Sequence, residues 1–456
     1  MKRDRDERTR RSPHVGRRGV LGGLSALGGS VMLRSLATGI PAAVLMDPLS
    51  AGADMELPAK TLLIASSRLG DPMNANVPGC YGGPDFDDLY HPLGPEMTPT
   101  DIMLGSVATR AAKPWADLDQ GVLDRAVFFH HGTYTPVHGE MPRVQRMMDG
   151  TERNDMLVSL LSRELAPRLG SVQAEPVTLG ANNGGELLSS EGRIIGNVAP
   201  LSVRAALGGV DGPLKRLTAL RDKHVDAIHA LYQRRGTPSQ RRLLDRWVRS
   251  RQDVREISTG LIGRLEQIDN NGEVNQVRTA AVLAAMNISP VISVHIDFGG
   301  DNHVDADLSR ERDRHVTGCA TIGALMAEID GLKSEGSLSQ GVIFATLNVF
   351  GRTLKKKARA GRDHNSAHHC MVMMGDGLEG GIVGGLEKGG KNGEWRATSI
   401  DRDSGDGVPG DAGNIPFEET LFSAGKTLGA ALGVHRDRLD EMLTSGAVVE
   451  SVFSST

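Results

Sequence analysis

Six short apolar runs, separated by longer amphipathic segments, constrain the fold of this sequence most. The runs are continuous rather than alternating, which is typical of strands covered on both faces of a sheet. Strands that alternate with helices predict an α/β fold with a doubly wound, mostly parallel sheet and helices on both faces. The predicted strands are Thr61–Ser67, Arg125–His130, Glu175–Leu179, Val291–Asp297, Gly341–Leu347 and Cys370–Met374.

The chain has 456 residues, which is enough for one large α/β domain. We expect this domain to span residues 54–456. Within it, the stretch from about 210 to 287 is charge-rich, and its apolar residues recur at spacings of three and four, which predicts a helical insertion. Asp155–Leu165 and Thr317–Leu332 also have helical patterns, and Phe417–Leu443 predicts two short helices. Gly389–Asn414 is rich in Gly and Asp and predicts a mobile loop.

The first 53 residues have the features of an export leader. An Arg-rich segment ends in Arg17-Arg18, a mildly apolar stretch follows, and Ala51-Gly52-Ala53 offers a cleavage site. This order is typical of a twin-arginine signal, so we expect an exported bacterial protein of the periplasm or cell envelope. Arg34 interrupts the apolar region, so no stable transmembrane span is expected after cleavage, although an uncleaved anchor is the alternative.

Composition excludes several functional classes. The net charge is −4 and aromatic residues make up 4% of the chain, which argues against a nucleic-acid partner. Three cysteines, Cys80, Cys319 and Cys370, fit neither a complete disulfide set nor a zinc-finger spacing, so we interpret them as buried thiols. P-loop, Gly-x-Ser-x-Gly and His-Glu-x-x-His motifs are absent from the sequence.

Asp and His residues gather after two of the apolar runs. Asp301 and His303 follow the run that begins at Val291, and Asp363 and His364 follow the run that begins at Gly341. Carboxylate and imidazole ligands together suit zinc, manganese or iron better than calcium, and zinc is our first expectation. For any single residue the alternative is a turn-capping or hydrogen-bonding role. If the strand continued through Asp301 and His303, both side chains would point to the same side.

Other candidate residues follow further predicted strands. Asp71 comes just after the first strand and is a third metal-ligand candidate. The polar segment from His130 to His138 contains Thr133 and Thr135, whose hydroxyls are nucleophile candidates if a metal activates them. Arg352 is a candidate for binding an anionic phosphate or sulfate group, with a structural salt bridge as the alternative.

These segments together resemble a bacterial family, domain of unknown function fifteen-oh-one, which has a sulfatase-like, alkaline-phosphatase-superfamily fold. The likeness covers most of the chain after the leader. It rests on Arg68–Asn74, Gly299–His303, Val349–Thr353, Gly361–His364 and Gly380–Gly385, which occur in the family's order. Gly361–His364 is the most specific match. The helical middle is similar to a sister family, domain of unknown function fifteen-fifty-two.

The resemblance implies an alkaline-phosphatase-like fold and two metal positions. It implies that Asp71, Asp363 and His364 hold one metal and that Asp301 and His303 hold the other. The superfamily's remaining histidine is not identified by a motif, and His368 and His369 are candidates by proximity. The chain departs from the family at Val349, which replaces a Glu, at Leu69, which replaces a Gly, and at Gly300, which replaces a Trp. No nucleophile motif is evident.

Two functions are consistent with these features. The first is an exported metal-dependent hydrolase that acts on small anionic substrates, namely phosphate or sulfate esters. The alternative is a non-catalytic envelope protein that retains a degenerate alkaline-phosphatase fold and binds an exported protein partner. A redox role lacks support because the chain has no haem or cysteine-cluster motif.

Overall fold

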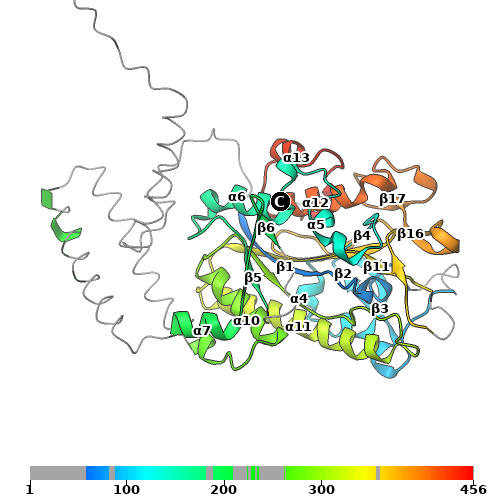
Figure 1. Ribbon diagram of the computed structural model, residues 1–456, viewed down its shortest axis with the longest axis horizontal. Helices are drawn as coiled ribbons and strands as arrows, with labels where there is room; N and C mark the ends of the chain where they lie inside the picture. Colours follow the sequence, from blue (N-terminus) through cyan, green and yellow to red (C-terminus); the bar gives the residue numbers. More distant parts are fainter. Residues whose placement is uncertain are drawn as a thin grey trace, which may run out of the picture. The chain divides into compact units, whose positions relative to one another are not determined.

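An eight-stranded sheet forms the centre of the fold, with the strand order β14-β4-β13-β10-β1-β9-β5-β8 (Figure 1). Within this sheet β13 is antiparallel to both of its neighbours, and the other paired strands are parallel. The mixed α/β fold with a mostly parallel central sheet is therefore confirmed. The strands are β1 Lys60–Ser67, β4 Ala126–His131, β5 Val177–Leu179, β8 Asn197–Val198, β9 Val291–Val294, β10 Gly341–Asn348, β13 His369–Gly375 and β14 Gly381–Val383.

The computed structural model describes residues 58–81, 88–180, 188–208, 261, 263–355 and 360–454, with a few positions between 223 and 235. The predicted export leader lies outside the described residues, as does most of the predicted helical insertion. Within the predicted insertion range, α10, Glu273–Ala285, packs against β9 and α11 as part of the α/β domain. Among the described residues, no helix has both the length and the apolar character to cross a membrane.

Helices cover both faces of the sheet (Figure 1). Alternate residues of each strand point to opposite faces, so Leu63 and Phe344 join the core under one helical layer while Leu62 and Ile343 join the other. Burying a side chain of this size stabilises the fold by roughly 1.5–3 kcal/mol, which explains the continuous apolar runs. The layer on one face contains α10 and α11, Ser309–Ser334, and the layer on the other contains α6, Leu157–Leu169, α12, Thr420–Ala431, and α13, Arg436–Met442.

Smaller elements surround this core. The short helices are α3 Lys113–Ala116, α4 Gln120–Leu123, α5 Met141–Gln145 and α7 Pro200–Gly208. Five two-stranded sheets pair β2 Pro99–Leu104 with β3 Val107–Ala112, β6 Ser189–Ser190 with β7 Arg193–Ile194, β11 Gly351–Arg352 with β12 His364–Asn365, β15 Leu386–Lys388 with β16 Trp395–Ala397, and β17 Ser399–Ile400 with β18 Gly407–Val408. Gly389–Asn414, predicted as a mobile loop, therefore contains β16, β17 and β18.

The strand that begins at Val291 does not continue through Asp301 and His303. β9 ends at Val294, and the chain turns at Gly299 and Gly300, whose φ angles are 117° and 54°. A side chain at these positive φ values would be strained, so the two glycines permit the turn that ends the extended chain. Asp301 and His303 therefore lie on a loop, and strand alternation does not set their directions. β1 also lies between β9 and β10, so the two predicted clusters do not follow neighbouring strands.

The carboxyl ends of β1, β4, β9 and β10 meet at one edge of the sheet because these strands run in the same direction. In open α/β sheets, binding sites form at this edge. The segments that leave the four strands there contain the candidate residues. β11 then pairs with β12, which aligns Arg352 with His364. This hairpin returns the Gly361–His364 segment to the same edge.

We predict that His315 makes the fold sensitive to acid. Its buried ring packs edge-on against Trp115 and Phe298, neither ring nitrogen has a hydrogen-bond partner among the described residues, and burial lowers its pKa from 6.5 to about 3. Between these values the unfolded chain binds a proton that the folded chain does not, so stability falls as the pH drops below 6.5. At pH 5 the loss is about 2 kcal/mol.

Urea unfolding of the wild type and of His315→Leu at pH 7.5 and pH 5.0 checks this prediction. The variant should lose about 2 kcal/mol less free energy of unfolding between the two pH values than the wild type. Equal losses in the two proteins would contradict the prediction. Leucine suits the test because it retains an apolar side chain between the two aromatic rings.

Candidate metal centre

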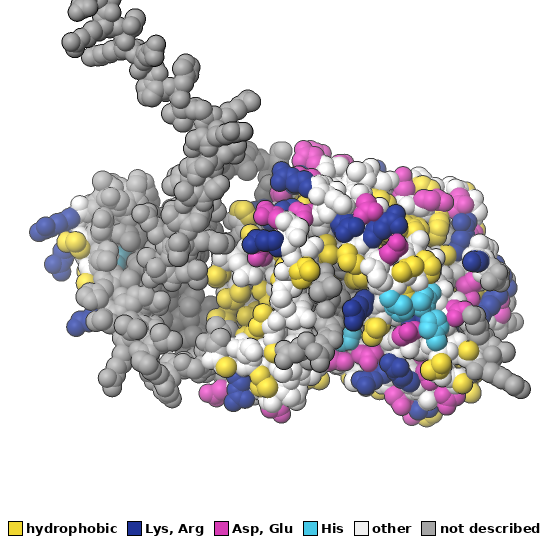
Figure 2. Space-filling view, in the orientation of Figure 1, with side chains coloured by type: hydrophobic (Ala, Val, Ile, Leu, Met, Phe, Trp, Pro, Cys, Tyr) yellow, Lys and Arg dark blue, Asp and Glu magenta, His cyan; other side chains and the backbone are white. Residues whose placement is uncertain are grey.

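Four side chains that carry metal-ligating atoms converge at the carboxyl edge of the sheet. They are His138, Asp301, His303 and His364, and we call them the metal group. Their ligand atoms all lie within 4.8 Å of one another. A patch of histidine side chains is visible on the exposed face of the protein (Figure 2). The described residues thus contain a grouping able to bind a metal.

Three segments of the chain supply the metal group. His138 begins the short 3-10 helix His138–Glu140, which follows β4. Asp301 and His303 lie on the loop between β9 and α11, and His364 begins β12. Residues that are up to 226 positions apart therefore meet because their segments leave the sheet, or return to it, at the same edge.

Each imidazole of the metal group is held through its Nδ1 atom. His138 Nδ1 lies 2.7 Å from the carbonyl oxygen of Arg68, and His364 Nδ1 lies 2.5 Å from that of Pro136. His303 Nδ1 lies 3.3 Å from a carboxylate oxygen of Asp363. Carbonyl oxygens only accept, so His138 and His364 carry a proton on Nδ1. In the neutral form these two rings present an unprotonated Nε2 atom, as metal-ligating histidines do.

The Nε2 atoms of two members of the metal group approach one another closely. His303 Nε2 lies 2.8 Å from His364 Nε2, and the guanidinium of Arg352, which can only donate, lies 3.4 Å from the same His303 nitrogen. Two lone pairs at that separation repel unless a proton or a cation lies between them. Burial lowers the pKa of His364, and the nearby charge of Arg352 adds to this effect, which disfavours a second proton on His364. A metal cation therefore fits the donor set.

Asp301 completes the metal group with an ionised carboxylate. One of its oxygens lies 3.3 Å from His303 Nε2, and the other lies 3.7 Å from His138 Nε2. Burial opposes ionisation, but the adjacent Arg352 guanidinium outweighs it and holds the pKa of this carboxyl below its ordinary value. Three imidazoles and one carboxylate are a ligand set that suits zinc, iron or manganese.

Arg352 orients this carboxylate. Its buried guanidinium donates to Asp301 at 2.9 Å, to the carbonyl oxygen of Leu69 at 2.5 Å and to the carbonyl oxygen of Gly70. Three of its hydrogen bonds therefore join the end of β1 to the loop that carries Asp301. These contacts do not test the prediction that Arg352 binds an anionic group.

Asp71 and Asp363, both predicted as ligands, lie beside the metal group rather than within it. A carboxylate oxygen of Asp363 lies 3.3 Å from Nδ1 of His303, where it orients that ring. Asp71 is buried and accepts the Gly300 N–H at 2.7 Å, while its other oxygen has no hydrogen-bond partner among the described residues. Burial raises the pKa of Asp71 to about 6. Asp71 therefore supports the Gly299–Gly300 turn.

His368 belongs to a second group, formed with Cys80 and His130, that is completely buried. Asn74 fixes the protons there, because its side-chain amide pairs with both the N–H and the C=O of Arg352 and so must donate to His368 Nδ1, at 3.0 Å. His368 Nε2 then donates to His130 Nδ1 at 2.9 Å, and His130 Nε2 donates to the carbonyl oxygen of Pro78 at 3.0 Å.

This second group needs no metal to satisfy it. Each of its two rings carries one proton, and each of the four ring nitrogens has a suitable partner. Metal binding through His368 Nε2 would leave a proton on Nδ1, which would then face the Asn74 donor. Cys80 donates its thiol hydrogen to the carbonyl oxygen of Asn74, and burial raises the pKa of that thiol. The metal group is thus the better metal site.

The other sequence candidates are buried near these groups. His369 pairs with His131 across β13 and β4, with 3.2 Å between their ring nitrogens. The Thr133 hydroxyl is fully buried and has no hydrogen-bond partner among the described residues, and the Thr135 hydroxyl accepts the N–H of Val137. None of the three belongs to the metal group.

His138 is the member of the metal group that the sequence reasoning did not name as a ligand. It ends the polar segment after β4, in which the sequence analysis names Thr133 and Thr135 as nucleophile candidates. The available signal was a histidine in a loop after an apolar run. Its pairing with Asp301 depends on where that loop folds, which no local motif indicates.

A cleft of about 440 Å³ opens beside the metal group, with His364 in its wall. Asp363, Asn365, Ser366 and Glu394 contribute polar groups to its lining, and Lys355 and Lys391 contribute positive charge; Pro136, Thr353 and Ala367 complete it. A cleft of this size admits a small-molecule ligand. Its lining carries charges of both signs, two lysines and the carboxylates of Asp363 and Glu394.

Comparison with known proteins extends this description. A family model described as "Protein of unknown function (DUF1501)" matches residues 269–400. The matched segment includes Asp301, His303 and His364, while His138 lies outside it. The match supports the predicted relationship to that domain-of-unknown-function family. No curated protein matches the chain.

We predict that His138→Ala weakens zinc binding by at least about 100-fold, because removal of a direct ligand should cost as much as or more than the roughly 10- to 100-fold loss caused by removal of an outer partner. Isothermal titration of the metal-free protein with Zn²⁺ measures this change. His435→Ala is the matched control, since His435 caps α13 outside the metal group. Unchanged zinc affinity in His138→Ala would contradict the assignment of this residue.

We predict that His368→Leu leaves zinc affinity unchanged but lowers the free energy of unfolding by about 1–3 kcal/mol. The substitution removes the donor to His130 and leaves a buried ring nitrogen without a partner. Zinc titration and urea unfolding of the same preparation separate the two effects. A large fall in zinc affinity without loss of stability would instead assign His368 to a metal site.

Proposed function

We propose that this protein is an exported metal-dependent hydrolase that acts on phosphate or sulfate esters. The observation that carries the proposal is the 2.8 Å approach of the Nε2 atoms of His303 and His364, in a group completed by His138 and Asp301. An alkaline-phosphatase-like fold and an export leader are part of the same proposal.

Exposure favours a catalytic over a structural metal site. Structural zinc sites are closed, whereas catalytic sites keep a position open to substrate. The side chains of Asp301 and His303 are 44% and 39% exposed. The cleft next to His364 gives a substrate space to lie against the metal group, and Lys391 in its lining is a positive group that a phosphate or sulfate could contact. These features support hydrolysis of an anionic ester.

The residues of the metal group have distinct roles in this proposal. His138, His303 and His364 would hold a divalent ion through Nε2, with Asp301 as the anionic ligand. Bound there, the ion supplies Lewis-acid polarisation of an ester oxygen and activation of water. Arg352 keeps Asp301 oriented and ionised. The Thr133 and Thr135 hydroxyls are buried, so we propose water rather than a threonine as the nucleophile.

Hydrolysis of p-nitrophenyl phosphate, bis(p-nitrophenyl) phosphate and p-nitrophenyl sulfate by the zinc- or manganese-loaded protein tests the proposal. We expect activity toward at least one of them and a loss of at least about 100-fold in Asp301→Asn, since removal of one electrostatic group at a reacting centre costs about that much. Thr133→Val should retain activity within a few-fold, because its hydroxyl lies outside the metal group.

The control for Asp301→Asn is Asp437→Asn, which changes an exposed aspartate paired with His435 on α13. A protein that binds metal stoichiometrically but hydrolyses none of the three esters would contradict the proposed reaction. That result would favour the alternative of an envelope binding protein. Loss of activity in Thr133→Val with metal retained would restore the threonine as a nucleophile candidate.

A further inference from the structure

Two loops that supply the metal group are in direct backbone contact. The Gly361 N–H donates to the carbonyl oxygen of His303 at 2.7 Å. A Cβ atom at position 361 would lie 1.8 Å from the carbonyl oxygen of Asn302, so only glycine permits this approach. The loop that carries Asp301 and His303 therefore lies against the segment that leads to His364.

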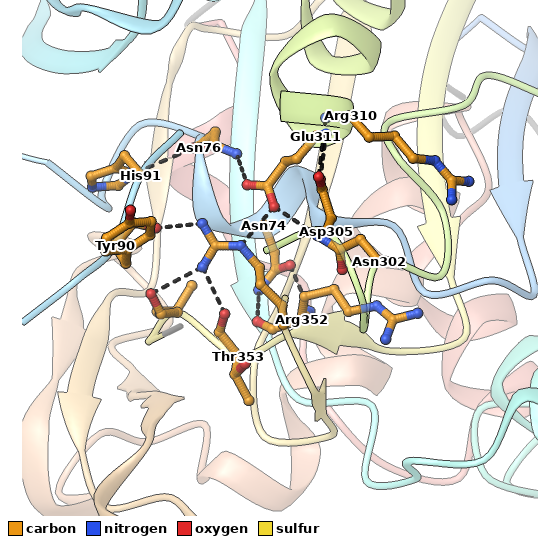
Figure 3. A network of polar contacts seen from close by, with 12 residues as sticks. Asn74, Asn76, Tyr90, His91, Asn302, Asp305, Arg310, Glu311, Arg352 and Thr353 are labelled. Carbon is orange, nitrogen blue, oxygen red and sulfur yellow. Dashed lines mark hydrogen bonds and ion pairs between the residues drawn. The ribbon is translucent and has the colours of Figure 1, made fainter. Parts of the chain in front are cut away.

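A buried ion pair lies behind this contact. Arg362 donates through Nε to a carboxylate oxygen of Glu311 at 2.7 Å, and both side chains are completely buried. Glu311 belongs to the first turn of α11, and Arg362 follows Gly361. Glu311 lies within the polar network drawn in Figure 3. The ion pair therefore joins the start of α11 to the segment that carries His364.

Each partner of the ion pair is fully engaged. Arg362 also donates to the carbonyl oxygens of Thr353, at 2.8 Å, of Leu354, at 3.0 Å, and of Tyr90. These contacts attach the arginine to the strand-end segment that follows β11. Because a buried guanidinium with well-placed acceptors has one favourable geometry, the position of Arg362 is narrowly determined.

Glu311 holds the other loop in the same way. Its two carboxylate oxygens accept from Asn76 and from Asn302, each at 2.8 Å. Asn302 lies between the two ligands Asp301 and His303, so its side chain anchors that loop from behind. Asp305 accepts the Glu311 N–H at 2.9 Å and fixes the start of α11 relative to the same loop (Figure 3).

We propose that Arg362 and Glu311 are positioning residues that set the metal affinity of the centre. The ion pair fixes Asp301 and His303 relative to His364 and makes no contact with the metal itself. A buried ion pair is weak evidence of stability, because well-packed apolar residues are often as stable in its place. The hydrogen bonds to Asn302 and to the segment after β11 instead tie the pair to the ligands. The inference rests on the proposed metal centre.

Zinc titration of wild type, Glu311→Gln and the double variant Arg362→Met/Glu311→Met tests this role. We expect zinc affinity to fall by about 10- to 100-fold in both, as when an outer partner of a ligand is removed. The double variant leaves no unpaired buried charge, so it remains informative if Glu311→Gln does not fold. The absorption spectrum of the Co²⁺-loaded proteins should also change, because it reports the geometry of the ligands.

The matched control is Lys426→Met, which breaks an ion pair between a buried lysine of α12 and Asp440 of α13. It should reduce stability but retain wild-type zinc affinity and the wild-type Co²⁺ spectrum. Wild-type affinity and spectrum in the double variant would overturn the positioning role while leaving the metal centre intact. If the wild type itself bound no zinc or cobalt, the proposed function would fail, and the positioning role with it.

Discussion

The parallel pairing of β1 with both β9 and β10 brings the carboxyl ends of three strands to one edge of the sheet, and the metal group depends on that arrangement. The strands are buried on both faces, so the polar residues that follow them must lie in the loops at that edge. β4, which runs in the same direction, brings the His138 segment there as well. The metal group therefore lies at this edge because the faces of the sheet are covered by helices.

Two histidine groups lie in this part of the molecule, and the location of their protons distinguishes them. In the buried group, the Asn74 amide nitrogen donates to His368, so a single set of tautomers satisfies His368 and His130. In the metal group, Asp363 and Asp301 each lie 3.3 Å from one ring nitrogen of His303, so no neutral tautomer of His303 can donate to both carboxylates. The same residue type therefore stabilises the core in one place and offers ligands in the other.

Residues around the metal group contact its members directly or hold the loops that carry them. Arg352 keeps Asp301 ionised, Asp363 contacts Nδ1 of His303, and the Glu311–Arg362 pair joins the start of α11 to the segment that carries His364. The four neighbouring residues 361–364 therefore make different contacts. The glycine permits close approach of the loop that carries Asp301, and the arginine pairs with Glu311. The aspartate contacts His303, and the histidine belongs to the metal group. Loss of any one of these contacts would leave ligands that are present but poorly placed.

Apolar runs and polar strand-end clusters are local patterns, so the sequence alone predicted the α/β class and the positions of β1, β4, β10 and β13. The same patterns named Asp301, His303 and His364 as metal-ligand candidates. Tertiary structure alone decided that β9 ends at Val294, that His138 joins the metal group, and that Asp363 and Asp71 stand beside it. His368 is close to His364 in sequence, yet the two lie in separate groups, since β12 turns the chain before β13 enters the core. Sequence indicates which side chains are able to bind a metal, but their convergence depends on strand order and loop contacts between residues far apart in the chain.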